Sequence, residues 1–152
     1  ICPSLGSTSS YAPMEIVLDS CTLIAATNLN DPNHGSSAAL INRLADDGYT
    51  IIAPVTQLWD IAAYSHHPEK SKTHAPYLNA SFSVQHHDVT HNLFVGTHSP
   101  AMTAIKGPDR VFVSLAKARG LPLITADGQI LKNAHLLGVR TISVEEFVAN
   151  GA

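Results

Sequence analysis

Short apolar runs alternate along the chain with segments in which apolar residues recur at helical spacing. The runs predict strands at 16–18, 50–53, 121–125 and 139–142, with a further strand that begins near residue 83. Helical spacing predicts a helix from Ser20 onward and others at 36–46, 55–64, 107–119 and 128–137. Strands alternating with helices predict the α/β class, as a three-layer α/β/α sandwich around a central, mainly parallel sheet of about five strands.

Turn and capping residues divide these elements. Gly48 and Gly120 follow helical segments and are expected to end them. Ser143 and Glu146 have the spacing of a capping box, which predicts a last short helix. In the helix at 55–64, the residues expected to share the buried face are Leu58, Ile61 and Ala62.

The length of 152 residues is typical of a single domain, which we place at 14–149. Residues 1–13 are rich in Ser, Pro and Gly and carry no charge, so a flexible tail or an expression remnant is expected there, with 150–152 as a short C-terminal tail. No apolar run approaches the ~18 residues of a membrane helix. Two cysteines make no disulfide framework, which favours a reducing, cytoplasmic location.

Four aspartates stand at the ends of strands or near the starts of helices: Asp19, Asp60, Asp109 and Asp127. The first and last directly follow predicted strands, and parallel strands place their carboxyl ends at one edge of a sheet. Because Mg²⁺ and Mn²⁺ prefer oxygen ligands, such a group of carboxylates predicts a divalent-metal site. Helix capping explains three of them equally well. Asp60 has no capping role, since it lies inside a helix.

The net charge of −3 argues against a general nucleic-acid binder. Setting the four aspartates aside leaves eight acidic residues against nine basic ones, and Lys106 and Arg110 flank Asp109 as a candidate phosphate-binding rim. Seven of the nine histidines lie between His66 and His98. They lack the spacing of a zinc motif, so solvent-facing or RNA-facing histidines are favoured over a zinc site.

Several sequence blocks resemble the PIN-domain ribonucleases, especially the VapC-like toxins of type II toxin–antitoxin pairs. The matching strings are IVLDSCTLIAA, DPNHGSSAALINRL, PVTQLWDIAAY, IKGPDRVFVSLAKARGLPLITADGQIL and GVRTISVEEF. Together they cover residues 14–149, and the block around Asp109 and Asp127 is the most specific. The middle, 65–100, carries little of the resemblance.

The resemblance implies an endoribonuclease that depends on Mg²⁺ or Mn²⁺ and uses the four aspartates as metal-binding catalytic acids. Ser20 and Thr125 match hydroxyl positions that often support the first and last acids. It also implies an RNA substrate, a small antitoxin partner and a homodimer. Two positions depart from the family pattern: the second acid is usually Glu but here is Asp60, and Cys21 replaces a Ser or Asn.

Other interpretations start from the same first aspartate. A haloacid-dehalogenase-type phosphatase needs a second aspartate at the position of Cys21, and a receiver-type phosphoacceptor needs paired acids that this chain lacks. A catalytically weak or inactive PIN-like module that binds RNA or a protein partner is the stronger alternative. The shorter acid at Asp60 is its support, and metal-dependent cleavage would separate it from an enzyme.

Overall fold

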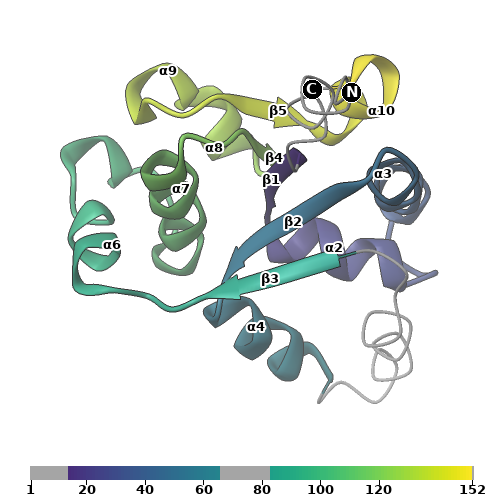
Figure 1. Ribbon diagram of the computed structural model, residues 1–152, viewed down its shortest axis with the longest axis horizontal. Helices are drawn as coiled ribbons and strands as arrows, with labels where there is room; N and C mark the ends of the chain where they lie inside the picture. Colours follow the sequence, from purple (N-terminus) through teal and green to yellow (C-terminus); the bar gives the residue numbers. More distant parts are fainter. Residues whose placement is uncertain (1–13, 66–82, 152) are drawn as a thin grey trace, which may run out of the picture.

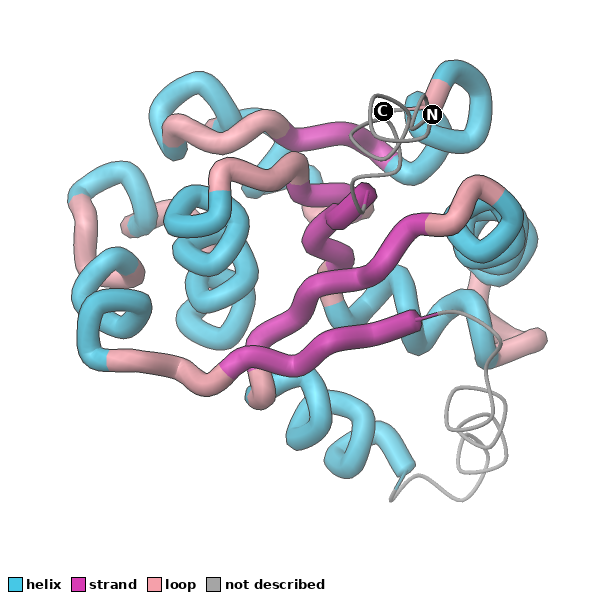
Figure 2. Tube along the Cα trace, in the orientation of Figure 1, coloured by secondary structure: helices cyan, strands magenta, loops and turns pink. Residues whose placement is uncertain are grey.

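The central sheet has five parallel strands in the order β3-β2-β1-β4-β5. In this computed structural model, which describes residues 14–65 and 83–151, they cross the middle of the molecule (Figures 1 and 2). Their bounds are β1 Met14–Leu18, β2 Tyr49–Pro54, β3 Ser83–His87, β4 Leu123–Thr125 and β5 Thr141–Ser143. The predicted parallel α/β sandwich is confirmed.

Helices cover both faces of the sheet. One face is covered by α2 (Ser20–Thr27), α3 (His34–Asp46), α4 (Thr56–Ser65) and α10 (Val144–Asn150). The other is covered by α6 (His91–Gly96), the 3₁₀ helix η3 (Pro100–Met102), α7 (Gly107–Arg119), α8 (Gly128–Lys132) and α9 (Ala134–Leu137). Within the described residues, no helix is both long enough and apolar enough to cross a membrane.

Strand β1 shows why the sequence builds this arrangement. Ile16 and Leu18 enter the core beneath α2, α3 and α10, whereas Val17 enters the core beneath α7, and all three are fully buried. Successive strand residues point to opposite faces, so a sheet covered on both sides requires a continuous apolar run. The runs in the sequence are therefore buried strands.

Several predicted elements differ in extent; β4, for example, begins at Leu123 rather than at residue 121. The helix expected at 128–137 is divided into α8 and α9 at Asn133, whose side-chain amide donates to the carbonyl of Gln129 at 2.8 Å. A side chain that bonds the backbone in this way competes with the helix and favours its end. The last strand lies at Thr141–Ser143, later than predicted, although Val139 still packs in the core.

The buried face of α4 also differs from the prediction. Leu58 is 43% exposed and Ala62 is exposed, whereas Ile61 is buried as expected. The position beside Ile61 is taken by Gln57, which is fully buried and donates through Nε2 to the carbonyl of Leu18 at 3.4 Å. A polar side chain is tolerated in the core when it is hydrogen-bonded. Because the prediction considered apolar residues only, it assigned Leu58 and Ala62 to the buried face and left out Gln57.

The order of the strands defines where a ligand site is expected. The chain runs outward from β1 through β2 to β3, and then crosses to β4 and β5 on the other side of β1. The order therefore reverses between β1 and β4, and ligands of open α/β sheets gather at the carboxyl ends of strands at such a point. Asp19 follows β1 and Asp127 follows β4, so both predicted acids lie at this edge.

Candidate metal centre

Asp19 joins β1 to α2 and is held on both carboxylate oxygens. Oδ1 accepts from the backbone N–H of Thr22 at 2.9 Å, so Asp19 is the N-cap of α2. Oδ2 accepts from Oγ1 of Thr125 at 2.5 Å. The side chain is only 4% exposed. Capping therefore does not exclude a role in a metal site, because these bonds hold the carboxylate in a fixed orientation.

Asp60 lies inside α4, where its carboxylate faces α2. The hydroxyl of Ser20 donates to Asp60 Oδ2 at 2.6 Å. Ser20 is the first residue of α2 and is buried. This bond connects two helices through residues 40 positions apart, and it brings Asp60 next to the residue that follows Asp19. Ser20 was expected to support the first acid but bonds the second, and the hydroxyl that supports the first acid is that of Thr125.

Asp127 is placed by the turn that leaves β4. It is the N-cap of α8, with Oδ1 accepting from the N–H groups of Gln129 and Ile130. Its own backbone N–H donates to Thr125 Oγ1 at 2.9 Å. Thr125 is fully buried, so one hydroxyl holds the Asp19 carboxylate and the backbone of Asp127 together.

Asp109 lies in the first turn of α7 and is half-buried. Burial is the main reason why the pKa of its carboxyl rises from 3.8 to about 6; the charges of Asp127 and Asp19 and a hydrogen bond with the Asp127 side chain add to this rise. Lys106 acts in the opposite direction. Like charges close together disfavour ionisation, so the shift indicates that three of the four acids lie close to one another.

All four acids affect the pKa of the Cys21 thiol. Partial burial and then the charges of Asp19, Asp109, Asp60 and Asp127, in that order, raise the pKa of Cys21 from 9.0 to about 11. A thiol with such a pKa stays protonated at neutral pH and is a poor nucleophile. All four aspartates are therefore close enough to Cys21 to affect its ionisation.

A cavity of about 360 Å³ opens at this point. Its walls come from α2, α4 and the start of α7, and its lining residues are Ser20, Cys21, Ile24, Asp60, Ala63, Pro108 and Asp109. Asp19 and Asp127 are not among the lining residues, so they lie beneath or beside the cavity rather than in its walls. The space is large enough for several water molecules or a phosphate group.

The donor set fits a divalent cation in its chemistry. Four carboxylates are ligands that Mg²⁺ and Mn²⁺ prefer, and the charges of Asp127 and Asp19 add to the effect of burial in raising the pKa of Asp109. In residues 14–65 and 83–151, however, no three or more His, Cys, Asp and Glu side chains already lie close enough to hold an ion.

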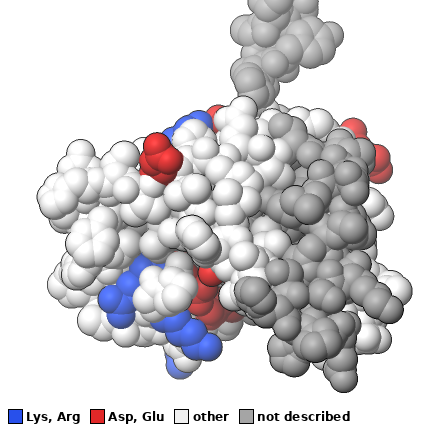
Figure 3. Space-filling view, turned by 90° about the horizontal axis from the view of Figure 1, so that it is seen from below, with Lys and Arg blue, Asp and Glu red and all other residues white. Residues whose placement is uncertain are grey.

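Basic side chains border the acids on one side. Lys106 is exposed and lowers the pKa of Asp109. Arg110 is half-buried, and its Nε donates to the carbonyl of Ile105 at 2.8 Å. Figure 3 shows basic and acidic side chains gathered side by side on the face seen from below. The predicted phosphate-binding rim is thus adjacent to the acids, while its role stays a prediction.

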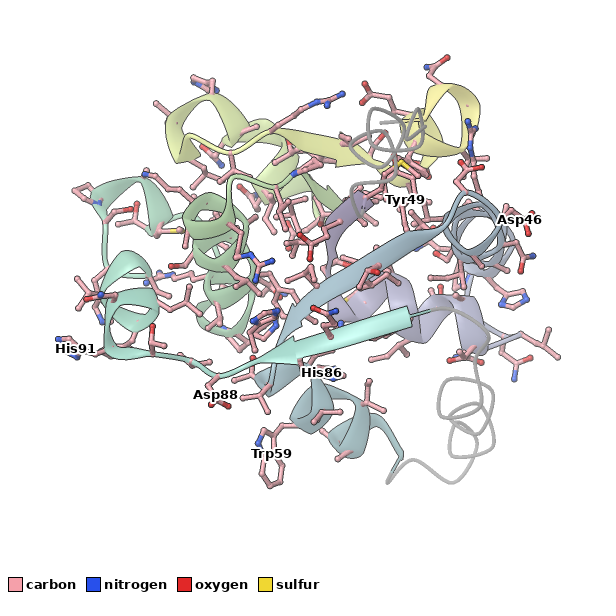
Figure 4. All side chains as sticks on the ribbon, in the orientation of Figure 1. Asp46, Tyr49, Trp59, His86, Asp88 and His91 are labelled. Atoms are coloured by element: carbon pink, nitrogen blue, oxygen red, sulfur yellow. The ribbon has the colours of Figure 1, made fainter. Side chains whose placement is uncertain are left out.

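Gln57 and His86 form a polar pair near the site that the sequence did not indicate. The ring Nε2 of His86 lies 3.2 Å from Oε1 of the buried Gln57, which also bonds the carbonyl before Asp19. Burial, and secondarily His87, lowers the pKa of His86, which favours its neutral form. His86 faces α4 from β3 (Figure 4). The histidines at 66, 67 and 74 lie outside the described residues, so the prediction about a zinc site that includes them stays a prediction.

We predict that Asp109→Asn stabilises the metal-free protein at pH 7 but not at pH 4. Native Asp109 holds its proton up to about pH 6, whereas the unfolded chain releases it near 3.8. The stability that this difference provides is complete below pH 3.8 and is lost as the pH rises through about 6. Because the group is half-exposed, solvent screening reduces the effect to about 1–2 kcal/mol.

The measurement is thermal unfolding in EDTA across this pH range. The gain in Tm for Asp109→Asn should grow as the pH rises from about 4 to about 6 and should then amount to a few degrees. Asp46→Asn, a change at an exposed residue of α3, serves as the matched control. An equal gain at pH 4 and pH 7 would contradict the proposed crowding of carboxylates.

Comparison with known proteins agrees with this architecture. The model of the PIN domain family matches residues 16–136. Among solved structures, the crystal structure of VapBC2 from Rickettsia felis, bound to a DNA fragment from their promoter, is similar with a TM-score of 0.64 and 15% identity, covering 86% of this chain and 98% of that one. At this identity the likeness concerns the fold. No curated protein sequence matches. Since the family model spans most of the sequence, the chain belongs to the PIN domain family.

Proposed function

We propose that the chain is a divalent-metal-dependent endoribonuclease and the toxin of a toxin–antitoxin pair. Membership of the PIN domain family supports a nuclease in general terms. The more specific activity is supported chiefly by the way the four acids are held at the carboxyl edge of the sheet: the Thr125 hydroxyl joins Asp19 to the backbone of Asp127, and Asp60 and Asp109 line the same cavity.

The proposed reaction is hydrolysis of an RNA phosphodiester bond. A bound Mg²⁺ or Mn²⁺ would supply an activated water and neutralise charge on the phosphoryl oxygens. Asp19 and Asp109 are proposed as the main ligands of the ion, and Asp60 and Asp127 as the acids that complete the site or orient the water. Thr125 fixes the Asp19 carboxylate and Ser20 fixes that of Asp60. Lys106 and Arg110 would contact the phosphates beside the cleaved bond.

The proposed partners follow from the family resemblance and the structural neighbour. The similar structure is described as VapBC2 bound to DNA, and by analogy we propose a small antitoxin partner and a homodimer for this chain. Expression in a bacterial host tests the toxin role. Growth should stop with the wild type but not with Asp19→Asn, while light scattering measures whether the purified protein is dimeric.

A second candidate is a PIN-like module that binds RNA or a protein without cutting. It is favoured by the shorter acid at position 60, where the family usually has Glu. Binding of RNA or of a partner that persists without any cleavage would support this candidate.

Incubation of a structured RNA pool with Mn²⁺, with Mg²⁺ and with EDTA separates the two candidates. Cleavage that needs the metal and is absent from an Asp19→Asn preparation purified in parallel supports the nuclease. The variant controls for contaminating ribonucleases, since it passes through the same purification. No cleavage by the wild type under any condition would favour the binding module.

Asp60→Glu tests whether the short acid is a defect or an adapted ligand. Because Ser20 already holds the Asp60 carboxylate at 2.6 Å, an extra methylene would displace it. We therefore expect the cleavage rate to fall by roughly tenfold, as for the loss of a supporting contact near a metal. The measurement is kcat with saturating Mn²⁺. A higher rate would mean instead that Asp60 is too short for the ion.

A further inference from the structure

A second cavity, of about 270 Å³, lies at the end of the sheet opposite the four acids. Its walls include Pro122 and Arg140, which directly precede β4 and β5 and so lie at the amino ends of these strands. The last turn of α7 completes the walls. Asp109, near the acids, and Lys117, in this cavity, are eight residues apart on α7, or about 12 Å along the helix axis. The two cavities are therefore separate.

Backbone hydrogen bonds hold the walls of this second cavity in place. The N–H of Leu121 donates to the carbonyl of Ala116 at 2.9 Å, which turns the chain back at the end of α7. The carbonyl of Arg140 accepts from the N–H of Leu123 at 2.9 Å, which ties the segment before β5 to the start of β4. The cavity is thus already formed without a ligand, as sites for small ligands usually are.

Two basic residues, Lys117 and Arg140, line this cavity from different elements. Lys117 extends from α7 to the turn before β5, because a β-carbon placed on Gly138 would lie 3.6 Å from its Nζ. Arg140 comes two residues after Gly138. Two positive charges therefore border one small cavity.

Contacts within the fold do not account for these charges. Neither Lys117 nor Arg140 forms an ion pair with a carboxylate of residues 14–65 or 83–151. Lys117 is not needed to cap α7, because the backbone N–H of Gly120 already donates to the carbonyls of Ala116 and Lys117. A cavity lined by charges of one sign concentrates the electrostatic field and attracts ions of the opposite sign.

We propose that this cavity binds a phosphate monoester, such as the phosphate end of a sugar phosphate or a mononucleotide. At neutral pH such a group carries a charge of about −1.5 to −2, which matches two cations. Arginine binds phosphate through two parallel hydrogen bonds, and lysine binds it as a point charge. The site uses none of the four acids, so this inference does not rest on the proposed function.

Size and charge favour this ligand over a carboxylate or a phosphodiester, each of which carries a single negative charge. The volume of about 270 Å³ is slightly below the usual range for small-molecule sites, so it suits a compact ligand. The same terminal phosphate also occurs at the 5′ end of an RNA strand. The experiment below separates these two sources.

Phosphorus NMR in EDTA tests the site directly, since the chelator keeps divalent ions from drawing phosphate to the four acids. We would add the wild-type protein to ribose 5-phosphate in about 0.15 M NaCl, where loose attraction between exposed charges is screened. Dimethyl phosphate, a diester with one negative charge, is the comparison ligand. A saturable change in the ribose 5-phosphate signal, with little change for dimethyl phosphate, is the expected result. No saturable change, or equal changes for both, would overturn the proposal.

Variants locate the bound phosphate. Lys117→Gln and Arg140→Gln should each weaken binding of ribose 5-phosphate by about tenfold or more, as for loss of a hydrogen bond to a charged group. Lys132→Gln, which removes one charge from an exposed residue of α8, is the matched control and should leave binding unchanged. Equal weakening by all three would show a response to net charge alone and overturn the site. Loss of binding in Lys106→Gln, with normal binding in Lys117→Gln, would place the phosphate beside the acids and also overturn it.

Competition in EDTA distinguishes the sources of the phosphate. Displacement of ribose 5-phosphate by a short RNA with a 5′-phosphate, but not by the same RNA with a 5′-hydroxyl, assigns the site to the end of a nucleic-acid strand. Displacement by neither RNA assigns it to small phosphates, and both results support the proposal. Equal displacement by the two RNAs would overturn it, because internal diesters would then be sufficient. Cleavage of RNA in Mn²⁺ tests the proposed function separately, so either idea can fail while the other stands.

Discussion

Replacement of Asp19 by asparagine is expected to reduce RNA cleavage by on the order of 10³-fold, since a bound cation and its ligands supply several kcal/mol of transition-state stabilisation. Asparagine has nearly the same volume and is an equally good N-cap. It can still accept from the N–H of Thr22, as Asp19 does. What it removes is the charge that a metal ion needs, so activity should fall much further than stability.

Two measurements made together test this expectation. The rate of cleavage in Mn²⁺ should fall to background, while Tm should change by only a few degrees. Asp46→Asn is the matched control, because it removes one carboxylate from an exposed position on α3 and should leave both values unchanged. Full activity of Asp19→Asn would exclude Asp19 from the site, and loss of the folded state would show that its structural role dominates.

The fold was predictable because buried parallel strands leave a plain signal. The apolar run at Ile16, Val17 and Leu18 serves two cores at once, and such runs between helical segments admit few other architectures. The misplaced details depend on single polar contacts. The side chain of Asn133 bonds the carbonyl of Gln129 where α8 ends. The spacing of apolar residues does not predict such a helix end.

The positions of three acids were predictable because Asp19 and Asp127 follow strands and Asp109 begins a helix, whereas Asp60 lies inside α4. Their supports were only partly predictable. Ser20 and Thr125 were recognised as hydroxyl positions, but the partner of Ser20 is Asp60, 40 residues away. The Gln57–His86 pair was missed, since it joins a helix to a strand across 29 residues. Contacts of this kind come from tertiary packing, which local sequence patterns do not encode.

Thr125→Val is expected to weaken metal binding by about 10–100-fold, the usual cost of removing a group that orients a metal ligand. The Thr125 hydroxyl connects two of the acids, because Oγ1 donates to Asp19 Oδ2 and accepts from the backbone N–H of Asp127. Valine has a similar shape but no hydroxyl. A buried carboxylate oxygen then loses its donor, which costs about 1–3 kcal/mol of stability.

The rise in Tm that Mn²⁺ produces measures this effect without relying on activity. Binding to the folded state alone raises stability in proportion to the logarithm of the ion concentration over Kd. The Mn²⁺ titration of Thr125→Val should therefore shift to higher concentration. Thr125→Ser, which retains the hydroxyl, should restore most of the affinity.

A matched control separates orientation of the acids from simple loss of stability. Thr97 is also buried, and its hydroxyl donates to the carbonyl of Phe94 on α6, away from the acids. Thr97→Val should therefore lower Tm without moving the Mn²⁺ titration. An unchanged titration in Thr125→Val would mean that Thr125 supports the fold but does not orient Asp19. A shift in both variants would mean that metal affinity follows overall stability, and the role assigned to the Thr125 hydroxyl would then be wrong.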